Sequence, residues 1–307
     1  MSRDNQFFQE LCAVMPEEGR VLQQEPMKNH TTFKVGGPAK YFVRPKSSEE
    51  LAEVIALCRE RGCAWYILGN GSNLLVGDKG IDGVVISMEE GFSSIRIEGN
   101  CVVCGAGALL SRIARTVWEG ALTGFEFAAG IPGTLGGAVV MNAGAYGSEI
   151  KDVLAWVRVL DAEGKVEVLP ASALGLAYRS SIFQENGMVV LEAGLLLEKG
   201  DREESRRRME ELAAARREKQ PLEYPSAGST FKRPQGYFAG KLIQDAGLRG
   251  KQIGGAQVSE KHCGFVINRD NASAQDIREL CAYVAGEVER QFGVKLELEV
   301  KVLGEWF

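Results

Sequence analysis

Clusters of glycine constrain this chain more than any other feature of its sequence. The 307 residues include 37 glycines, and the excess gathers at residues 69–71, 105–107, 130–137 and 144–147. Glycine adopts positive φ and lets a ligand approach the backbone closely. Several such turns in one domain can therefore present N–H groups to a pyrophosphate. Any single cluster is explained better as a tight turn alone. The prediction of a phosphate cradle therefore depends on the occurrence of several such clusters in one chain.

Two common phosphate-binding motifs do not fit these glycines. A P-loop requires G-x-x-x-x-G-K-[ST], but the nearest candidate, at 236–241, has a different spacing and is followed by Leu242. Gly69 and Gly71 begin a dinucleotide fingerprint, yet its third glycine position is Leu74. The sequence therefore predicts neither a Walker-type NTPase nor a Rossmann dinucleotide site.

The charge balance argues against nucleic-acid binding. The chain has 36 basic and 41 acidic residues and a net charge of −5, whereas affinity for a phosphate backbone needs a positive surface. The triple arginine at 206–208 stands among glutamates and predicts a solvated helix face. The weakly polar run 128–145 contains five glycines and a proline, which predicts a buried turn and no membrane insertion.

Cysteine and histidine usage predicts a reduced, cytoplasmic protein without a metal site. The seven cysteines are scattered along the chain and are expected to be free thiols. Cys101 and Cys104 have C-x-x-C spacing but no second pair or nearby histidine, which favours packed strand cysteines. The two histidines are too few for a multi-histidine metal site. The first thirty residues lack the basic start and apolar core of a secretory signal.

Periodicity predicts mixed helices and strands, with the main domain boundary near Pro221. A helix is expected at 47–61, where Ser47 and Glu50 form a capping box and Gly62 ends the helix. Further helices are expected at 109–119, 202–219, 241–246 and 273–292. Strands are expected at 65–68, 84–86, 95–97, 102–104, 265–268 and 294–303, with a hairpin formed by 153–160 and 165–169.

Seven motifs, spread in order over almost the whole chain, carry a resemblance to a known family. They are NHTTF (29–33), YILGNGSNLLV (66–76), GFEFAAGIPGTLGG (124–137), NAGAYG (142–147), YRSS (178–181), AGSTFKRP (227–234) and LEV (298–300). Together they resemble the UDP-N-acetylenolpyruvoylglucosamine reductases, which are flavoenzymes of peptidoglycan precursor synthesis. Such an ordered set is far more specific than one glycine loop.

The resemblance implies an α+β fold in two domains. Residues 1–220 would form an FAD-binding domain of the vanillyl-alcohol-oxidase type, with subdomains at about 1–88 and 89–220. Residues 221–307 would form an α+β substrate-binding domain. The implied cofactor is non-covalent FAD, with NADPH as electron donor and a UDP-sugar enolpyruvyl ether as substrate. The implied role lies in cell wall biogenesis, and hence in cell shape and division, with no obligatory protein partner.

The same resemblance assigns residues to the cofactor and the substrate. Tyr178 and Lys219 are second-line candidates for substrate contact that could equally be surface residues, and Arg233 is a candidate contact of the diphosphate because a guanidinium suits phosphate oxygens. The implied cofactor-binding residues are Gly69, Asn70, Gly71, Ser72, Asn73, Leu74, Gly130, Ile131, Pro132, Gly133, Gly136, Gly137, Asn142, Ala143, Gly144 and Ala145.

Three residues match the family's catalytic positions. The implied reaction adds a hydride to the methylene carbon of the enolpyruvyl ether, and negative charge then spreads into the adjacent carboxylate. Arg179 would bind and stabilise that charge, because a guanidinium stays protonated and holds carboxylates bidentately. Ser229 would deliver the proton to the neighbouring carbon. Glu299 matches the acidic partner, with Glu297 as a rival on the same face of the expected strand.

One departure from the family places the chain in its shorter subclass. Some members carry an insertion after the Tyr-Arg motif, with a tyrosine that closes over the substrate. Here only residues 182–187 separate Ser181 from the next expected strand, so no such lid is expected.

Two other functions remain open on the sequence alone. The chain could be a flavin-dependent alcohol oxidase of the same FAD fold, which returns electrons to oxygen. It could also be a nucleotide-sensing module that kept the fold and lost the chemistry. The joint presence of Arg179, Ser229 and Glu299 argues against the second alternative.

Overall fold

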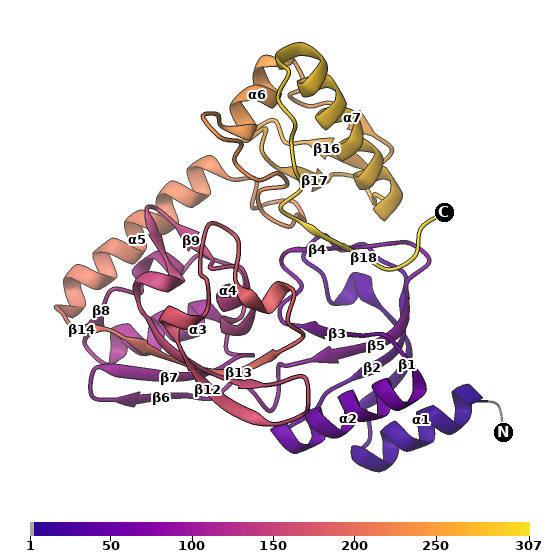
Figure 1. Cartoon of the computed structure of the whole chain (residues 1–307). Helices are drawn as coiled ribbons and strands as arrows, with labels where there is room; N and C mark the ends of the chain where they lie inside the picture. Colours follow the sequence, from indigo (N-terminus) through magenta and orange to yellow (C-terminus); the bar gives the residue numbers. More distant parts are fainter. Residues whose placement is uncertain (1–2) are drawn as a thin grey trace. The chain divides into compact units, whose positions relative to one another are not determined.

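The computed structural model describes residues 3–307, which divide into two compact units (Figure 1). Of the described residues, the first unit comprises 3–22, 41–70 and 83–215, and the second comprises Gln23–Lys40, Gly71–Asp82 and Arg216–Phe307. Strands β1 (Val21–Pro26), β2 (Pro38–Val43) and β5 (Ile81–Ser87) each run from one unit into the other.

The first unit is built on two larger sheets. A four-stranded sheet has the order β1-β2-β5-β3, and β3 (Trp65–Leu68) runs parallel to β5. A five-stranded antiparallel sheet has the order β12-β11-β13-β7-β6. Its strands are β6 (Ile95–Glu98), β7 (Cys101–Gly105), β11 (Leu154–Leu160), β12 (Val166–Pro170) and β13 (Val189–Leu196).

Helices and short ribbons complete this unit. The helices are α1 (Arg3–Val14), α2 (Ser48–Arg61), α3 (Leu110–Glu119), α4 (Leu135–Val140) and α5 (Arg202–Lys219), whose last residues enter the second unit. The ribbons are β8 (Leu122–Thr123) with β14 (Glu198–Lys199) and β9 (Gly144–Ala145) with β10 (Ser148–Glu149). The 3-10 turns are η2 (Glu126–Ala128), η3 (Ile150–Asp152), η4 (Ala171–Ala173) and η5 (Ile182–Gln184).

One hydrophobic core holds this unit together. Strand β13 is buried along almost its whole length, because its Val, Leu and Ala side chains pack on both sides of the sheet. Helix α3 turns the buried residues Leu110, Ile113 and Val117 toward the same core, at the spacing of one helix face. Strand β13 and helix α3 thus share one hydrophobic core.

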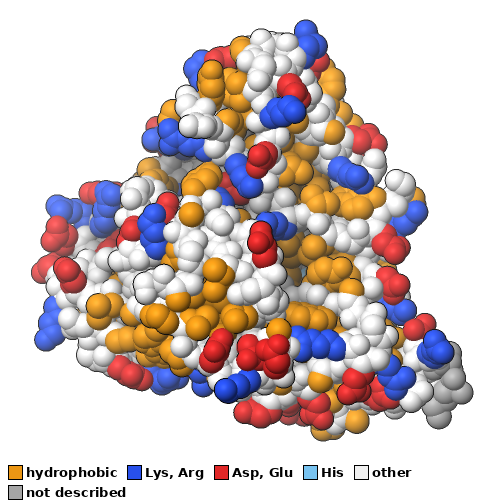
Figure 2. Space-filling view, in the orientation of Figure 1, with side chains coloured by type: hydrophobic (Ala, Val, Ile, Leu, Met, Phe, Trp, Pro, Cys, Tyr) orange, Lys and Arg blue, Asp and Glu red, His pale blue; other side chains and the backbone are white. Residues whose placement is uncertain are grey.

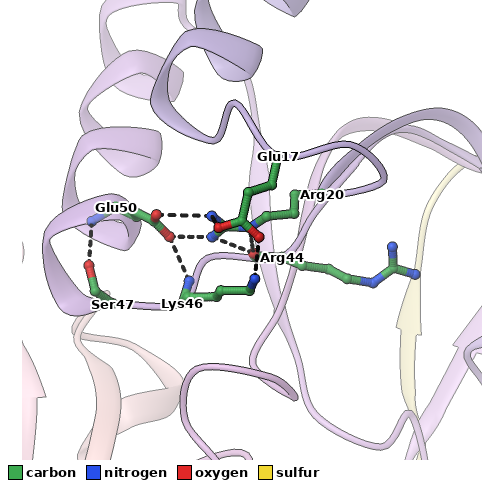
Figure 3. A network of polar contacts seen from close by, with 6 residues as sticks. All are labelled: Glu17, Arg20, Arg44, Lys46, Ser47 and Glu50. Atoms are coloured by element: carbon green, nitrogen blue, oxygen red, sulfur yellow. Dashed lines mark hydrogen bonds and ion pairs between the residues drawn. The ribbon is translucent and has the colours of Figure 1, made fainter.

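A buried arginine joins the start of α2 to the segment before β1 (Figure 3). The Arg20 side chain is 5% exposed; its guanidinium donates to Glu50 Oε1 at 3.0 Å and to the Arg44 carbonyl at 2.9 Å. Ser47 Oγ accepts the Glu50 amide at 3.3 Å. The expected capping box is only half formed, because the Glu50 carboxylate binds Arg20 and the Lys46 amide instead of the Ser47 amide.

The second unit has its own core around one long helix. Helix α7 (Ala274–Phe292) packs on the three-stranded sheet β15-β16-β17 and on α6 (Ala239–Asp245), as Figure 1 shows. The strands are β15 (Gln252–Ile253), β16 (Ala256–Val258) and β17 (Val266–Asn268), and η1 (Met27–Asn29) precedes them in the chain. A separate ribbon pairs β4 (Leu74–Val76) in parallel with β18 (Lys301–Leu303).

Most predicted elements are confirmed, and three predictions besides the capping box need correction. The strand expected at 294–303 is wrong before Lys301, because β4 offers a partner to only three residues of β18. The run 128–145 is not merely a turn, since it contains α4. Helix α6 begins at Ala239 instead of 241, after the N-cap residue Phe238.

The charged helix α5 and the α7 boundaries agree with the sequence analysis. Arg206 bonds to Glu203 and Glu210, and Arg208 pairs with Glu211, so the arginine run forms a solvated face. Figure 2 shows basic and acidic side chains mixed over the visible face. Helix α7 starts with a capping box formed by Ser273 and ends at Gly293. No helix within residues 3–307 is long and apolar enough to cross a membrane.

Candidate active site

The first glycine turn, residues 69–74, connects β3 to β4. Gly71 has a φ of 58°, and a Cβ there would lie 1.9 Å from the His30 carbonyl oxygen. A Cβ on Gly69 would lie 2.2 Å from Thr134 Oγ1. Both glycines are therefore required by close approach of the protein's own atoms, which the sequence could not show.

This turn leaves hydrogen-bond donors open. The backbone amides of Asn70, Gly71, Ser72 and Asn73 donate no hydrogen bond within residues 3–307. The Gly71 carbonyl accepts the Thr32 amide at 3.2 Å, and the buried Thr32 hydroxyl has no partner among the described residues. A group of open amides suits the phosphate oxygens of a dinucleotide. The turn thus fits FAD.

The second glycine turn, residues 130–137, leads into α4. The amides of Leu135 and Gly136 are bonded to the carbonyls of Ala108 and Ala106 at 2.9 and 2.8 Å. A Cβ on Gly136 would lie 2.9 Å from the Cβ of Ala106, so packing requires this glycine. Gly137 differs, because it is exposed and the nearest atom to a Cβ there would be 3.7 Å away. Among the neighbours of this position within residues 3–307, Thr134 Oγ1 at 3.7 Å makes only an ordinary van der Waals contact with such a Cβ.

The two glycine turns meet within the first unit. Asn70 Nδ2 donates to the Pro132 carbonyl at 2.7 Å, in addition to the approach of Gly69 to Thr134. Of the other expected cofactor residues here, Gly130 and Pro132 are exposed, and Ile131 and Gly133 are partly buried. The structure therefore brings the start of the first turn and the whole second turn together.

The segment 142–145 forms a buried corner and a small ribbon. The buried Asn142 has a φ of 40°, and its Nδ2 donates to Glu149 Oε2 at 2.8 Å and to the Ala177 carbonyl at 3.1 Å. Ala143 and the β9 residues Gly144 and Ala145 are partly buried. A Cβ on Gly144 would lie 2.6 Å from the Ser148 carbonyl oxygen, so pairing with β10 requires this glycine.

Arg179 lies at the tip of a tight turn. Ala177 and Ser180 exchange backbone hydrogen bonds of 3.1 and 3.2 Å, and Arg179 has a φ of 52°. Its guanidinium carbon lies 5.1 Å from the centroid of the half-exposed Tyr178 ring. A non-glycine residue in the left-handed region is strained, and such strain is concentrated at functional sites.

Glu149 lies close to this turn and is ionised. Its carboxylate accepts from Lys151 Nζ at 2.8 Å and from Asn142. The hydrogen bond from Lys151, followed by that from Asn142 and the charge of Arg179, holds the pKa of Glu149 below its ordinary value. Sequence reasoning missed Glu149; its only signal was the turn-capping spacing of Glu149 and Asp152.

In the second unit, Ser229 and Glu299 lie on neighbouring extended segments. The Glu299 amide donates to the Thr230 carbonyl at 2.9 Å, and Phe231 forms a bridge with Leu298. Ser229 is exposed, one residue before Thr230. Asn73 Nδ2 donates to the Glu299 carbonyl at 3.1 Å, so the end of the first glycine turn is bonded to the same segment. Of the three catalytic candidates, Ser229 and Glu299 therefore lie in the second unit, whereas Arg179 lies in the first.

The two rival glutamates have different surroundings. The Glu297 side chain is 73% exposed and pairs with Lys232 Nζ at 3.1 Å, whereas Glu299 is partly buried. Of the implied substrate contacts, Lys219 is the exposed last residue of α5. Arg233 is exposed and lies 4.0 Å from the centroid of the Phe238 ring.

In the described part of the chain the cysteines are free thiols and both histidines make hydrogen bonds. All seven thiols are free, and burial raises the pKa of Cys104 to about 12. His262 Nδ1 accepts the Gly264 amide at 3.0 Å, and burial lowers its pKa. No group of three metal-ligating side chains occurs within residues 3–307.

Comparison with known proteins defines the class. Residues 39–169 match the model of an FAD-binding domain, and residues 220–303 match the C-terminal domain of UDP-N-acetylenolpyruvoylglucosamine reductase. The FAD-binding fold also occurs in a variant of Phl p 4 described as a glucose oxidase, at a TM-score of 0.50, 13% identity and coverage of 64% of this chain and 44% of that one. Fold and site together define an FAD-dependent oxidoreductase, and the α+β prediction is confirmed.

Full-length relatives identify the family within that class. The chain is 55% identical over 306 residues to UDP-N-acetylenolpyruvoylglucosamine reductase of Lachnoclostridium phytofermentans, covering 98% of each protein. It is 53% identical over 289 residues to the reductase of Caldanaerobacter subterraneus subsp. tengcongensis, covering 94% of this chain and 95% of the relative. The crystal structure of the Thermus caldophilus reductase matches with a TM-score of 0.79 and 36% identity, covering 92% of this chain and 97% of that one. The chain belongs to the UDP-N-acetylenolpyruvoylglucosamine reductase family.

Proposed function

We propose that this protein reduces the enolpyruvyl ether of UDP-N-acetylenolpyruvoylglucosamine to the lactyl ether of UDP-N-acetylmuramate, using FAD and NADPH. The observation that carries the proposal is 55% identity to a reductase of that name over 98% of both chains. The reaction is a step of peptidoglycan precursor synthesis, and we place it in the cytoplasm. The partners are the UDP-sugar and NADPH.

FAD would be held by groups that the protein itself leaves open. The amides of Asn70 to Asn73 would bind its pyrophosphate. The space beside Gly137 would admit cofactor atoms close to the backbone of α4. When bound, FAD supplies the hydride that NADPH provides. The flavin is expected to be non-covalent, as the resemblance to the family implies.

Three side chains would act on the substrate. Arg179 would bind the carboxylate and stabilise the charge that develops on it, and its backbone is held at a φ of 52° in a closed turn. Ser229 would hold the proton delivered to the carbon next to the carboxylate. Glu299 is favoured over Glu297 as the acidic partner, because the latter is exposed and paired with Lys232.

The domain division and substrate contacts belong to the same proposal. Residues 1–220 would bind FAD, with subdomains at about 1–88 and 89–220, and residues 221–307 would bind the substrate. The ranges of the two family models, 39–169 and 220–303, support this division. Tyr178, Lys219 and Arg233 would contact the substrate. The short segment containing η5 supports the absence of a tyrosine lid.

Purified protein provides the test. It should be yellow, release its flavin into the supernatant on acid precipitation, and oxidise NADPH only when UDP-N-acetylenolpyruvoylglucosamine is added. The product should gain two hydrogens by mass spectrometry. A protein that fails to bind added FAD would refute the proposal. Flavin reduced by a simple alcohol and reoxidised by oxygen would favour the alcohol oxidase instead.

A further inference from the structure

We propose that Asn142 is a positioning residue for Arg179, acting through the backbone of the arginine's turn. The inference rests on the proposed function, since it takes the role of Arg179 from there. Asn142 lies in the NAGAYG motif, where the resemblance implied contact with the cofactor. Its contacts point to the turn of residues 177–180 instead.

The side chain of Asn142 uses both of its N–H donors inside the first unit. Its two amide hydrogens go to Glu149 Oε2 at 2.8 Å and to the Ala177 carbonyl at 3.1 Å. Its Oδ1 accepts the Lys151 amide at 2.9 Å. Because an asparagine side chain has two N–H donors, none remains for a cofactor or substrate. Asn142 is also fully buried.

The bond to Ala177 fixes the base of the turn that carries the arginine. Ala177 and Ser180 close the turn through two backbone hydrogen bonds, and Arg179 sits at its tip with a φ of 52°. A turn strained in this way persists only when its surroundings hold it. Removing the Asn142 side-chain amide from the Ala177 carbonyl takes away one of the hydrogen bonds that hold the turn in place.

Two more side chains tie the same turn to the end of α4. Ser181 Oγ donates to the Val140 carbonyl at 2.7 Å. Gln184 Nε2 donates to the Arg179 carbonyl at 2.9 Å and to the Val140 carbonyl at 3.3 Å. Asn142 follows Val140 by two residues, and α4 begins at the second glycine turn. One continuous segment therefore lines the cofactor cradle and holds the arginine's turn.

The backbone explains why asparagine suits this position. At a φ of 40°, asparagine, aspartate and glycine are the residues that the left-handed region tolerates best. Only asparagine among them offers two donors, and it faces two acceptor oxygens here. Asn142→Asp keeps the shape of the side chain but places a carboxylate oxygen opposite the Glu149 carboxylate and the Ala177 carbonyl, which are both acceptors. Asn142→Gly keeps the backbone conformation but removes the side chain.

The test measures the two half-reactions separately by anaerobic stopped flow. In Asn142→Gly and Asn142→Asp, NADPH should reduce bound FAD at the rate of the unaltered protein. Reoxidation by UDP-N-acetylenolpyruvoylglucosamine should slow by about 10–100-fold, the usual effect of a displacement near 1 Å. Asn271→Gly is the matched control, because Asn271 has a φ of 48° and is exposed in the second unit. It should alter neither half-reaction.

A double-mutant cycle with Arg179→Ala identifies the route of the effect. If Asn142 acts through the arginine, Asn142→Gly should add almost no further slowing to Arg179→Ala. Additive losses, or equal slowing of both half-reactions in both Asn142 variants, would overturn the positioning role and leave the proposed function intact. Normal reoxidation in Arg179→Ala would instead refute the role of Arg179 itself.

Discussion

Gly137→Ala should raise the stability of the apoprotein while weakening its affinity for FAD. Gly137 lies inside α4, and a methyl group there meets its nearest protein atom at 3.7 Å, so the folded chain accepts it without strain. Replacing a helix-interior glycine with alanine stabilises by about 0.5–1 kcal/mol. If FAD occupies the space beside Gly137, forcing the methyl into that contact costs about 1–3 kcal/mol. The dissociation constant should then rise about 5- to 150-fold.

Thermal unfolding of the apoprotein and titration of flavin fluorescence measure the two effects. Gly286→Ala is the matched control, since Gly286 lies inside α7 and a Cβ there has no neighbour within 4 Å. It should stabilise similarly and leave FAD affinity unchanged. Unchanged FAD affinity in Gly137→Ala would show that the cofactor does not contact α4 there. A less stable apoprotein would show that the space is not free.

Four further predictions test other parts of the molecule. Gly71→Ala should destabilise the apoprotein by about 2–5 kcal/mol, from its positive φ and the carbonyl 1.9 Å from the new Cβ. Gly62→Ala is the control, because Gly62 has a similar φ but open space around it, so urea titration of both variants should show a loss of only about 1–2 kcal/mol here. Ser229→Ala should leave flavin reduction by NADPH normal and slow reoxidation by the substrate about 10²–10⁴-fold in stopped flow; normal reoxidation would assign the proton elsewhere. Arg179→Lys keeps the positive charge but loses the bidentate guanidinium, so turnover should fall. Unchanged turnover would show that the arginine is structural or peripheral. Glu50→Gln should cost about 1–2 kcal/mol at pH 7; because Arg20 lowers the pKa of Glu50, this difference should vanish as pH falls through the folded pKa, and a pH-independent difference would contradict the ion pair.

The sequence predicted those features that depend on local periodicity and turn chemistry. Helix α7 was recognisable from its capping serine, its apolar face and Gly293, and α5 from its charge pattern. The terminal strand was overpredicted, because the length of β18 depends on β4, more than two hundred residues earlier in the chain. Local pattern carries no information about a distant partner.

The site shows the same division between local and long-range causes. The glycine clusters predicted a phosphate cradle, but the reasons for Gly69 and Gly71 are Thr134 and a carbonyl at His30. Likewise, the NAGAYG motif marked Asn142, while only the folded chain shows that its amide is bonded to Glu149 and Ala177. Residue types indicate the chemistry, and the fold decides which atoms remain available for it.

The central claim is that reduced flavin in this protein delivers its electrons to the enolpyruvyl ether. The direct measurement is to reduce the holoprotein with one equivalent of NADPH without oxygen, then add UDP-N-acetylenolpyruvoylglucosamine and follow the visible flavin absorbance. We predict full return of the oxidised spectrum, with one equivalent of UDP-N-acetylmuramate formed. A flavin that stays reduced until oxygen is admitted would contradict the account.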